Sequence, residues 1–422
     1  MVGRTLAICL ALGALAGAGP KKDPKEDEGF KRAVQKSIDR GVTWLVSRQA
    51  STGKFPAFED SRGEVYELGM HALATLAVIK GRRPLDSPEV TKALAVLQTL
   101  YERHRNNLKT YEVGVMLMVL DAKYSTPQAR KPRRRRKKKI KVSAKDAETA
   151  RALVNWLQLK QLPPGLWRYP ELGMDLSNTQ YAALGLWSAH RLGVKVNKGV
   201  VVRMLEATLE RQQKEGTKHV PFILDPELHR SDKEGHRTTS TIEARGWRYM
   251  PEERRETPDG AQKTIVYPYS GSMTSAGVAV LAIGRDILGP KDHWLTPARD
   301  RQLRRAMFEG LAWIQGNWDV QDNPGQRGNW PFYWIYGLER CARLSGVEYI
   351  GRRDWYYEGA TRLIPDQRPD GSWPRNQRMR PPGDQNVRWW SDQVDTCFAI
   401  LFLTKSTPEI RTPPPTLTRR ER

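Results

Sequence analysis

Cysteine, histidine and long apolar runs are scarce in this sequence. Only 3 cysteines occur in 422 residues, which excludes a fold framed by disulfides. Of the 7 histidines, three fall in one segment at irregular spacing (His219, His229 and His236), and this is not a recurrent zinc-ligand pattern. After residue 18 no apolar run approaches the length that crosses a bilayer. We therefore expect no metal site, no cofactor and no transmembrane segment.

Negative charge is also in short supply, since 47 acidic residues face 70 basic ones and the net charge is +23. Much of the excess lies in one segment, a predicted basic loop at 129–142 whose densest part is Arg133–Lys139. Like charges repel one another, so we expect an extended surface loop that could bind an anionic surface. The loop lacks the interleaved aromatic residues of single-strand binders, so no nucleic acid partner is expected. A solvated loop without a partner is the alternative.

The first 18 residues have the pattern of a secretory signal peptide. Arg4 precedes the apolar stretch Leu6–Leu15, and the small residues Ala16–Ala18 follow it. We expect an exported protein, periplasmic or extracellular, with a charged linker at 19–32. Residues 411–422 contain three consecutive prolines, at 413–415, and are predicted to be a disordered tail.

A short pattern recurs along the rest of the chain. It consists of two residues, usually apolar, then three spacers and a glutamine, and most copies continue with glycine, a spacer and an aromatic residue. The glutamines are Gln49, Gln98, Gln161, Gln213 and Gln367, and one copy has Trp318 in their place. The glycine elements are Gly53-Lys54-Phe55, Gly165-Leu166-Trp167 and Gly371-Ser372-Trp373, and the fourth copy has Gly246-Trp247.

Each copy predicts a pair of helices. The first is amphipathic, as in Val34, Ile38 and Val42, which repeat every fourth residue. The second is apolar around most of its circumference and is therefore expected to be buried on all sides. These second segments are 66–79, 111–120, 177–190, 272–287, 331–344 and 395–403, and two of them open with Ser and Thr as candidate N-caps.

Six such pairs predict an all-α fold. We expect an (α/α)6 toroid over residues 33–410, with the apolar helices as an inner ring, the amphipathic helices as an outer ring, and an insertion at 214–266. The alternative is an open superhelix, which would need polar capping repeats that the sequence does not show. Parallel inner helices in this register place Cys341 and Cys397 roughly 13 Å apart, beyond disulfide reach, so both thiols are expected to be free.

The repeat resembles the QW-type repeat of squalene and terpenoid cyclases. The opening of the third apolar helix, Asp175–Thr179, resembles inner helices of the terpenoid cyclase and protein prenyltransferase superfamily. The resemblance covers residues 33–405. It implies the α/α toroid fold, in which the Gln and Trp elements tie neighbouring outer helices together.

The chemistry of that superfamily is not carried over. Cyclases protonate an alkene with an Asp-x-Asp-Asp-Thr motif, and here Ser177 and Asn178 replace both central carboxylates. Prenyltransferases bind zinc through an Asp-x-Cys pair, which Asp395 and Cys397 match, and a later histidine. No histidine follows His293, so the zinc site is incomplete and Cys397 is expected to be a buried apolar residue.

The predicted site lies where the six inner helices begin. Four carboxylates there are weak catalytic candidates, namely Glu67, Glu112, Asp175 and Asp395, and their alternative role is to cap or balance the helix dipoles. The expected lining of a central cavity is Tyr66, Tyr111, Ser177, Tyr181, Ser272, Trp330, Tyr333, Tyr336 and Trp389, although these aromatics could also simply pack between the rings.

The function predicted from the sequence is binding of an apolar or extended ligand in that cavity. A lyase or isomerase is one interpretation, because Tyr333, Tyr336 and Arg340 on one helix are compatible with lyase chemistry. A non-catalytic binding or scaffold protein of the cell envelope is the other. The sequence favours neither.

Overall fold

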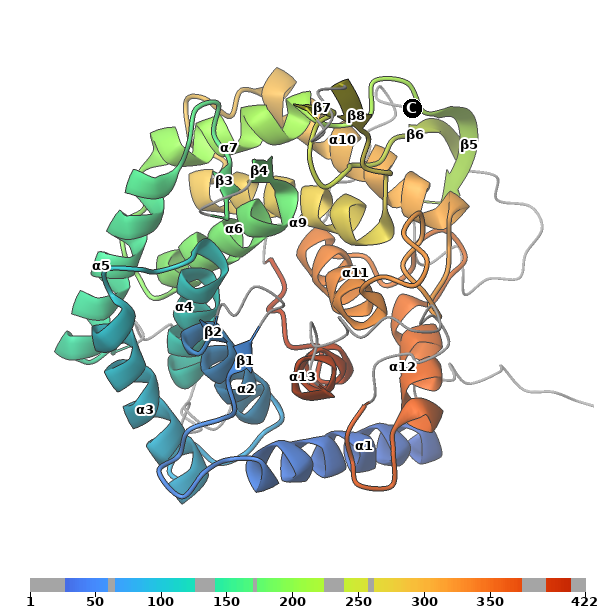
Figure 1. The fold of residues 1–422 in the computed structure, drawn as a ribbon. Helices are drawn as coiled ribbons and strands as arrows, with labels where there is room; N and C mark the ends of the chain where they lie inside the picture. Colours follow the sequence, from blue (N-terminus) through green and yellow to red (C-terminus); the bar gives the residue numbers. More distant parts are fainter. Residues whose placement is uncertain are drawn as a thin grey trace, which may run out of the picture.

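A computed structural model describes residues 27–59, 65–125, 141–169, 173–223, 239–256, 262–373 and 392–410. The predicted signal peptide, the Arg133–Lys139 run, Trp389 and the predicted tail at 411–422 lie outside these ranges. The described residues form 12 helices arranged as two concentric rings (Figure 1). The predicted all-α toroid is confirmed.

The inner ring consists of the predicted apolar helices. Each contacts the next around the ring, and the last, α13, also contacts the first, α2, so the ring is closed. Nearly every residue in these helices is buried, as their composition requires. Their bounds are α2 (Leu68–Lys80), α4 (Thr110–Ser125), α6 (Leu176–Arg191), α9 (Gly271–Leu288), α11 (Pro331–Ser345) and α13 (Asp392–Leu403).

The outer ring consists of the amphipathic helices. They are α1 (Glu28–Ser47), α3 (Pro88–His104), α5 (Ala144–Lys160), α7 (Lys198–Glu210), α10 (Pro297–Gly316) and α12 (Trp355–Asp366). The stripe of α1 that contains Val34, Ile38 and Val42 is buried as predicted. Helix α1 starts before residue 33, because the Asp27 carboxylate accepts a hydrogen bond from the Phe30 N–H and caps it. The predicted linker at 19–32 therefore extends too far.

Glutamine side chains join neighbouring outer helices. The Gln161 amide donates to the carbonyl oxygens of Gly165 (2.8 Å), in its own turn, and Val200 (2.9 Å), in α7. Equivalent pairs run from Gln49 to Gly53 and Glu89, and from Gln367 to Gly371 and Ser37. This arrangement, called the glutamine clamp below, confirms what the cyclase resemblance implied.

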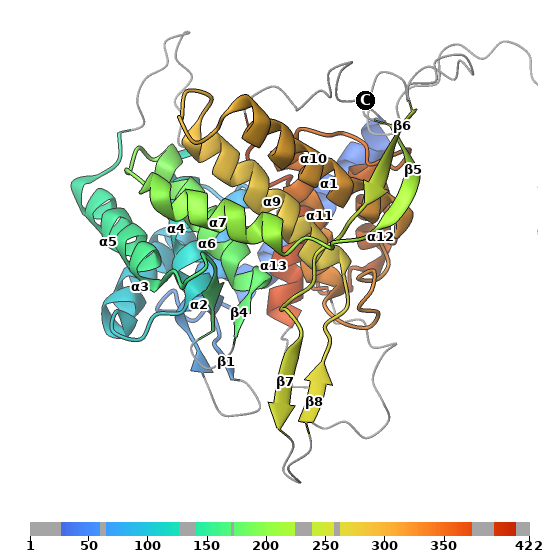
Figure 2. The same ribbon diagram turned by 90° about the horizontal axis from the view of Figure 1, so that it is seen from above.

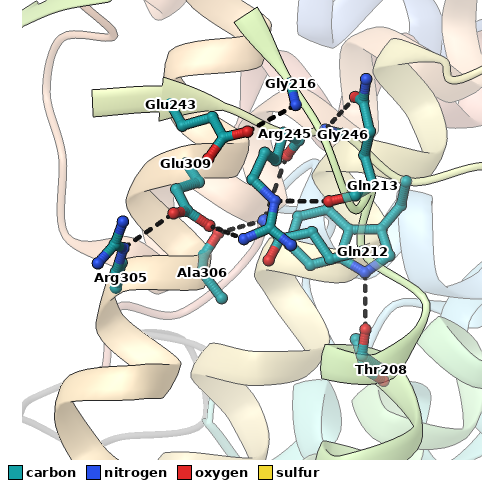
Figure 3. Close-up of polar contacts among 11 residues, drawn as sticks. Thr208, Gln212, Gln213, Gly216, Glu243, Arg245, Gly246, Arg305, Ala306 and Glu309 are labelled. Carbon is teal, nitrogen blue, oxygen red and sulfur yellow. Dashed lines mark hydrogen bonds and ion pairs between the residues drawn. The ribbon is translucent and has the colours of Figure 1, made fainter. Parts of the chain in front are cut away.

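The fourth clamp is one residue away from its predicted position. Gln212, and not Gln213, donates to the carbonyl oxygens of Ala306 (3.0 Å) and Arg245 (3.2 Å) (Figure 3). Gln213 instead accepts the N–H of Gly246 through its side chain. The register is set by Thr208, whose carbonyl accepts a hydrogen bond from the Trp247 indole. In the third copy the Leu157 carbonyl accepts the Trp167 indole in the same way. The clamp glutamine, Gln212 or Gln161, lies four residues after the carbonyl that accepts the indole.

The other two copies lack a glutamine clamp in the described structure. Gln98 donates to Glu102 on its own exposed helix face. The Trp318 indole donates to the Glu358 carboxylate (2.8 Å), so it still links the end of α10 to α12.

The buried tryptophans of the glycine elements connect the two rings. The backbone N–H groups of Trp167, Trp247 and Trp373 donate to the hydroxyls of Thr179, Thr274 and Thr396 on inner helices. Thr179 and Thr274 belong to the Ser and Thr pairs that were predicted to be N-caps. That prediction is wrong, because the caps are the side chains of Asp175 and Ser270.

Four two-stranded antiparallel ribbons complete the described structure. They are β1 (Phe58–Glu59) with β2 (Val65–Tyr66), β3 (Trp167–Arg168) with β4 (Met174–Asp175), β5 (Thr217–Ile223) with β6 (Thr239–Ala244), and β7 (Glu253–Glu256) with β8 (Gln262–Ile265). Strands β2 and β4 lead directly into α2 and α6, so they mark the face where the inner helices begin. The β7–β8 hairpin projects from that same face (Figure 2). We call this face the mouth.

Both predicted thiols are free and buried. Cys341 lies in α11 and Cys397 in α13. Across the described ranges, no helix has the length and apolarity to cross a membrane.

Candidate functional site

A line of aromatic rings runs from the mouth into the centre of the inner ring. The Tyr66 and Tyr111 rings lie 6.1 Å apart, and Tyr111 lies 6.2 Å from Tyr181 in an edge-on arrangement. Tyr181 stacks on Tyr333 at 6.4 Å. All four residues were predicted to line the site, and the structure brings them together from β2, α4, α6 and α11.

The rim carries further tyrosines that sequence reasoning missed. The Tyr169 ring lies 6.3 Å from that of Tyr111, and Tyr249 lies 5.6 Å from Tyr267. Tyr169 and Tyr249 each end a repeated Trp-Arg-Tyr sequence, so the repeat itself was the signal that could have revealed them. Tyr66, Tyr111, Tyr169 and Tyr249 are all partly exposed. They offer ring faces and hydroxyls to whatever enters the mouth.

Burial keeps these phenols protonated. It raises the pKa of Tyr111 and Tyr169 well above its usual value, and neighbouring Glu112 and Asp175 reinforce the effect. Burial also raises the pKa of Tyr336 to about 12. Near neutral pH the tyrosines are therefore hydrogen-bond donors and apolar surfaces, and not bases.

Side chains from inner helices that are not direct neighbours meet at the centre of the ring. Helix α9 separates α6 from α11, yet the Ser177 hydroxyl lies 2.9 Å from that of Tyr333. Gln180 Oε1 accepts hydrogen bonds from Tyr333 (3.0 Å) and from Arg340 (2.9 Å). We call the group that fills this level the central cluster, and it consists of Ser177, Gln180, Tyr181, Tyr333, Tyr336, Arg340 and Phe398.

Two of the predicted lining residues, Ser272 and Trp330, lie outside this group. Ser272 is buried against the loop before α11, where its hydroxyl accepts from the Asn323 amide (3.1 Å). Trp330 precedes α11 in a left-handed conformation and is 37% exposed. Trp389 is outside the described residues.

Two of the candidate carboxylates have structural roles. Burial raises the pKa of Glu67, but hydrogen bonds from Lys54 and His104 outweigh it and hold that pKa at about 2. A carboxylate balanced in this way is not a proton donor near neutral pH. Glu112 is buried and accepts backbone N–H groups of Gly69 (3.3 Å) and Lys109 (3.2 Å), so it joins α2 to α4.

The other two candidate carboxylates, Asp395 and Asp175, differ in what surrounds them. Asp395 is buried in the first turn of α13, and its charge acts on Arg362. Asp175 caps α6 by accepting the Asn178 N–H (2.7 Å) and side-chain amide (2.9 Å). Burial raises the pKa of Asp175 to about 7, and the Tyr249 hydroxyl is hydrogen-bonded to it. Among the four candidate carboxylates, Asp175 is the one whose pKa is placed near physiological pH, where it can exchange a proton.

No group of three or more His, Cys, Asp or Glu side chains suited to a metal ion occurs among the described residues. The Asp-x-Cys pair does not form such a site. Cys397 is buried and burial raises the pKa of its thiol, so the reactive thiolate is disfavoured.

No protein-family model matches the chain, and a search of curated proteins also finds no match. Solved structures do match. One is a variant of the type II terpene cyclase MstE from Scytonema, with a TM-score of 0.51 and 14% identity over 90% of this chain and 98% of that one. Another is a GH76A α-1,6-mannanase from a Salegentibacter species, with a TM-score of 0.55 and 10% identity over 88% and 99% of the two chains.

The chain has the α/α toroid fold. The likeness to terpenoid cyclases that the repeat predicted is confirmed at the level of the fold. A structure of a variant of the same mannanase contains α-1,6-mannotriose, at a TM-score of 0.54. One architecture therefore serves both an apolar and a sugar substrate in these other proteins, so the function of this chain has to be argued from its own side chains.

Proposed function

We propose that this is an exported toroid protein that binds an elongated ligand with apolar faces at its mouth. The line of tyrosine rings from Tyr66 to Tyr333 carries the proposal. Aromatic rings contribute large apolar area, and their hydroxyls add hydrogen bonds that fix orientation. The two neighbouring folds suggest an isoprenoid chain or an oligosaccharide, and both are elongated molecules of this kind.

Binding is favoured over lyase chemistry that uses a tyrosine base. Burial raises the pKa of Tyr333 and of Tyr336, so neither phenol is deprotonated near neutral pH. Arg340 contacts both rings, but its charge does not reverse the effect of burial.

A proton-transfer enzyme, either a lyase or an isomerase, is the second candidate. The pKa of Asp175, near 7, favours it, because an acid or base with a pKa close to the ambient pH transfers protons most effectively. The Asp175→Asn variant distinguishes the two functions. If the protein is an enzyme, the variant should lose turnover and still bind its ligand. If it is a binding protein, the variant should keep its full affinity for the ligand.

The binding proposal is tested first on the purified protein. Native mass spectrometry and solvent extraction would reveal a co-purifying isoprenoid or sugar. Titration with isoprenoid alcohols and with oligosaccharides, followed by intrinsic fluorescence, would then give the affinity. We expect Tyr111→Ala to weaken binding about tenfold, because a central aromatic contact contributes more than 1 kcal/mol.

A matched control is Tyr124→Ala, because Tyr124 is a partly buried tyrosine in the last turn of inner helix α4, at the end opposite the mouth. Its affinity should equal that of the unmodified protein. Equal losses in the two variants, or no binding of either ligand class, would refute the proposal.

Export is tested separately. The proposal expects a mature N-terminus directly after Ala18 when the full chain is produced in a secreting host. Mass spectrometry of the product would measure it, and an intact N-terminus in a fraction that stays inside the cell would contradict export.

A further inference from the structure

Arg340 is a fully buried arginine whose donors are only partly satisfied. It lies in the central cluster, with its guanidinium carbon 4.0 Å from the Tyr336 ring centre. Its Nη2 donates to Gln180, but Nε and Nη1 have no hydrogen-bond partner in the described structure. The side-chain amide nitrogen of Gln180 also lacks one. Unsatisfied buried donors are costly, and here several of them gather at one point.

The charge of Arg340 has no directly contacting counter-charge, although Glu339 acts on it through space. Among the described residues, no carboxylate lies within ion-pair distance of it. The adjacent Glu339 is directed to the chain after α13, where it accepts from the Thr407 N–H (2.9 Å) and hydroxyl (2.7 Å). Burial moreover raises the pKa of Glu339 to about 7, which reduces its negative charge at neutral pH.

Arg362 provides an internal comparison. It is also buried, and its Nε and Nη1 also lack hydrogen bonds. However, its Nε lies 3.4 Å from the Asp366 carboxylate, and Asp395, Asp322 and Asp319 act on the same charge. The protein thus places a carboxylate within ion-pair distance of one buried arginine, whereas Glu339 acts on the other only from beyond that distance.

We propose that the ring centre is an anion-binding site of carboxylate size. Arg340 supplies the charge and donors, and Gln180 supplies a further N–H. A buried cation without a counter-charge is strongly disfavoured, whereas one that binds an anion through charge-assisted hydrogen bonds is stable. The unpaired nitrogens are fully buried, so an anion reaches them only when side chains of the central cluster move apart, and this limits the anion to a small one.

Two sources of the anion share this chemistry. One is a free ion such as chloride or acetate. The other is the acid end of the elongated ligand, and this second source rests on the proposed function. The experiments therefore separate the site itself from its source.

The site is tested by thermal unfolding of the full chain after dialysis into sodium gluconate, whose anion is bulky. Gluconate is then replaced by chloride or acetate at constant ionic strength. We expect a saturable rise in Tm of about 2 °C or more, because a ligand that binds only the folded state stabilises it. A Tm that does not depend on the anion would overturn the proposal.

Substitutions assign the effect to Arg340. The Arg340→Met variant should lose the response to chloride and acetate. The control Arg362→Met removes a buried arginine that has internal counter-charges, so it should lower Tm and keep the response. A response that survives Arg340→Met, or that is lost in both variants, would contradict the assignment.

Gln180→Glu covers the case in which Arg340→Met does not fold. It places a carboxylate at the oxygen that already accepts from Arg340 Nη2 at 2.9 Å. We expect this variant to have a higher Tm in gluconate and no response to chloride, because its own carboxylate replaces the anion. A lower Tm with the chloride response intact would refute the site.

The source is tested with a long-chain acid and the matching alcohol. If the ligand's acid end occupies the site, the acid binds more tightly than the alcohol, and this difference disappears in Gln180→Glu. If the small-anion response is present but neither the long chains nor the oligosaccharides bind, the site holds a free ion and the proposed function fails alone. If the acid and the alcohol bind equally and small anions have no effect, the anion site fails alone.

Discussion

Two carboxylates of the mouth illustrate how burial and charge pairing oppose each other at single residues. Glu67 contacts three basic side chains, Lys54, Arg103 and His104, and its pKa falls to about 2. Asp175 receives N–H groups but no cation at ion-pair distance among the described residues, and burial raises its pKa to about 7. Ionised Glu67 therefore stabilises the folded state, whereas ionised Asp175 destabilises it.

The pH dependence of stability should show this for Asp175. Its pKa is about 7 when folded and about 3.9 when unfolded, so between these values the folded state holds a proton that the unfolded state lacks. Stability therefore falls as the pH rises from about 4 to about 7. We expect Asp175→Asn to be more stable than the unmodified chain at pH 7.5 by on the order of 2 kcal/mol, and equally stable near pH 4.

Urea unfolding between pH 4 and pH 8 measures this difference. The new amide can still cap α6, and the Asn178 oxygen, which lacks a partner, can turn to accept from it. Glu339, whose pKa burial also raises to about 7, leaves part of the slope in the variant. A constant loss of stability across the whole range would show that Asp175 acts only as a charged cap.

The stability of Glu67→Gln should depend on pH in the opposite way to that of Asp175→Asn. The folded-state pKa of Glu67, about 2, lies below the unfolded value, so its stabilisation is complete above about pH 4.5 and is lost as the pH falls through 2. We expect the variant to lose about 1–2 kcal/mol at pH 7. The loss should shrink at pH 3 in the same urea experiment, and a loss that grows on acidification would contradict the assignment.

At the scale of the helical pair, the glutamine clamp explains why outer helices with few direct contacts keep their spacing. Each clamp amide donates to two backbone carbonyls, one in its own turn and one in the next outer helix. The receiving carbonyl is near the start of the next outer helix for Gln49 and Gln161, and near its middle for Gln212 and Gln367. One side chain therefore fixes the end of one repeat against the outer helix of the next.

Removing one clamp should therefore cost more than removing an exposed glutamine. We expect Gln161→Ala to lose about 1–3 kcal/mol, because the Gly165 and Val200 carbonyls both lose their donor. Gln98→Ala is the matched control. Its amide contacts only Glu102 on the surface, so the change should stay within about 0.5 kcal/mol. Denaturant midpoints compare the two, and similar losses would show that the clamp is not a distinct source of stability.

The element scale also shows how far the sequence predicts this protein. Periodicity located all twelve helices, since an apolar stripe such as that of α1 has few other ways to be buried. It misplaced the fourth clamp, because Thr208 and Leu209 both fit the apolar slot and only the indole bond of Trp247 selects Thr208. The approach of α6 to α11 through Ser177 and Tyr333 was not predictable, because these helices are not neighbours in the ring and contacts across it leave no sequence period.

For the whole molecule, the decisive feature is that the last repeat bonds to the first. Gln367 of the final outer repeat donates to the Ser37 carbonyl in α1 (2.9 Å). Arg40 in α1 donates to the Pro369 carbonyl (3.1 Å), and the Gln393 amide of α13 reaches the Pro56 carbonyl (3.3 Å). A closed ring has no terminal repeat from which unfolding could begin, in contrast to an open array of repeats.

Closure predicts a distinctive pattern of hydrogen exchange. In the unmodified protein, the amides of α1 and α12 should exchange as slowly as those of α5 and α7. The Gln367→Ala variant removes the closing clamp, so the ring gains two frayed ends, and exchange should become faster in α1 and α12 only. The matched variant Gln161→Ala opens the ring between α5 and α7 and should move the fast-exchanging region there. Mass spectrometry of peptides from both variants measures this. If exchange rises at α1 in both variants, the N-terminal helix is a weak point independent of closure, because the location of the broken clamp then has no influence on where the ring opens.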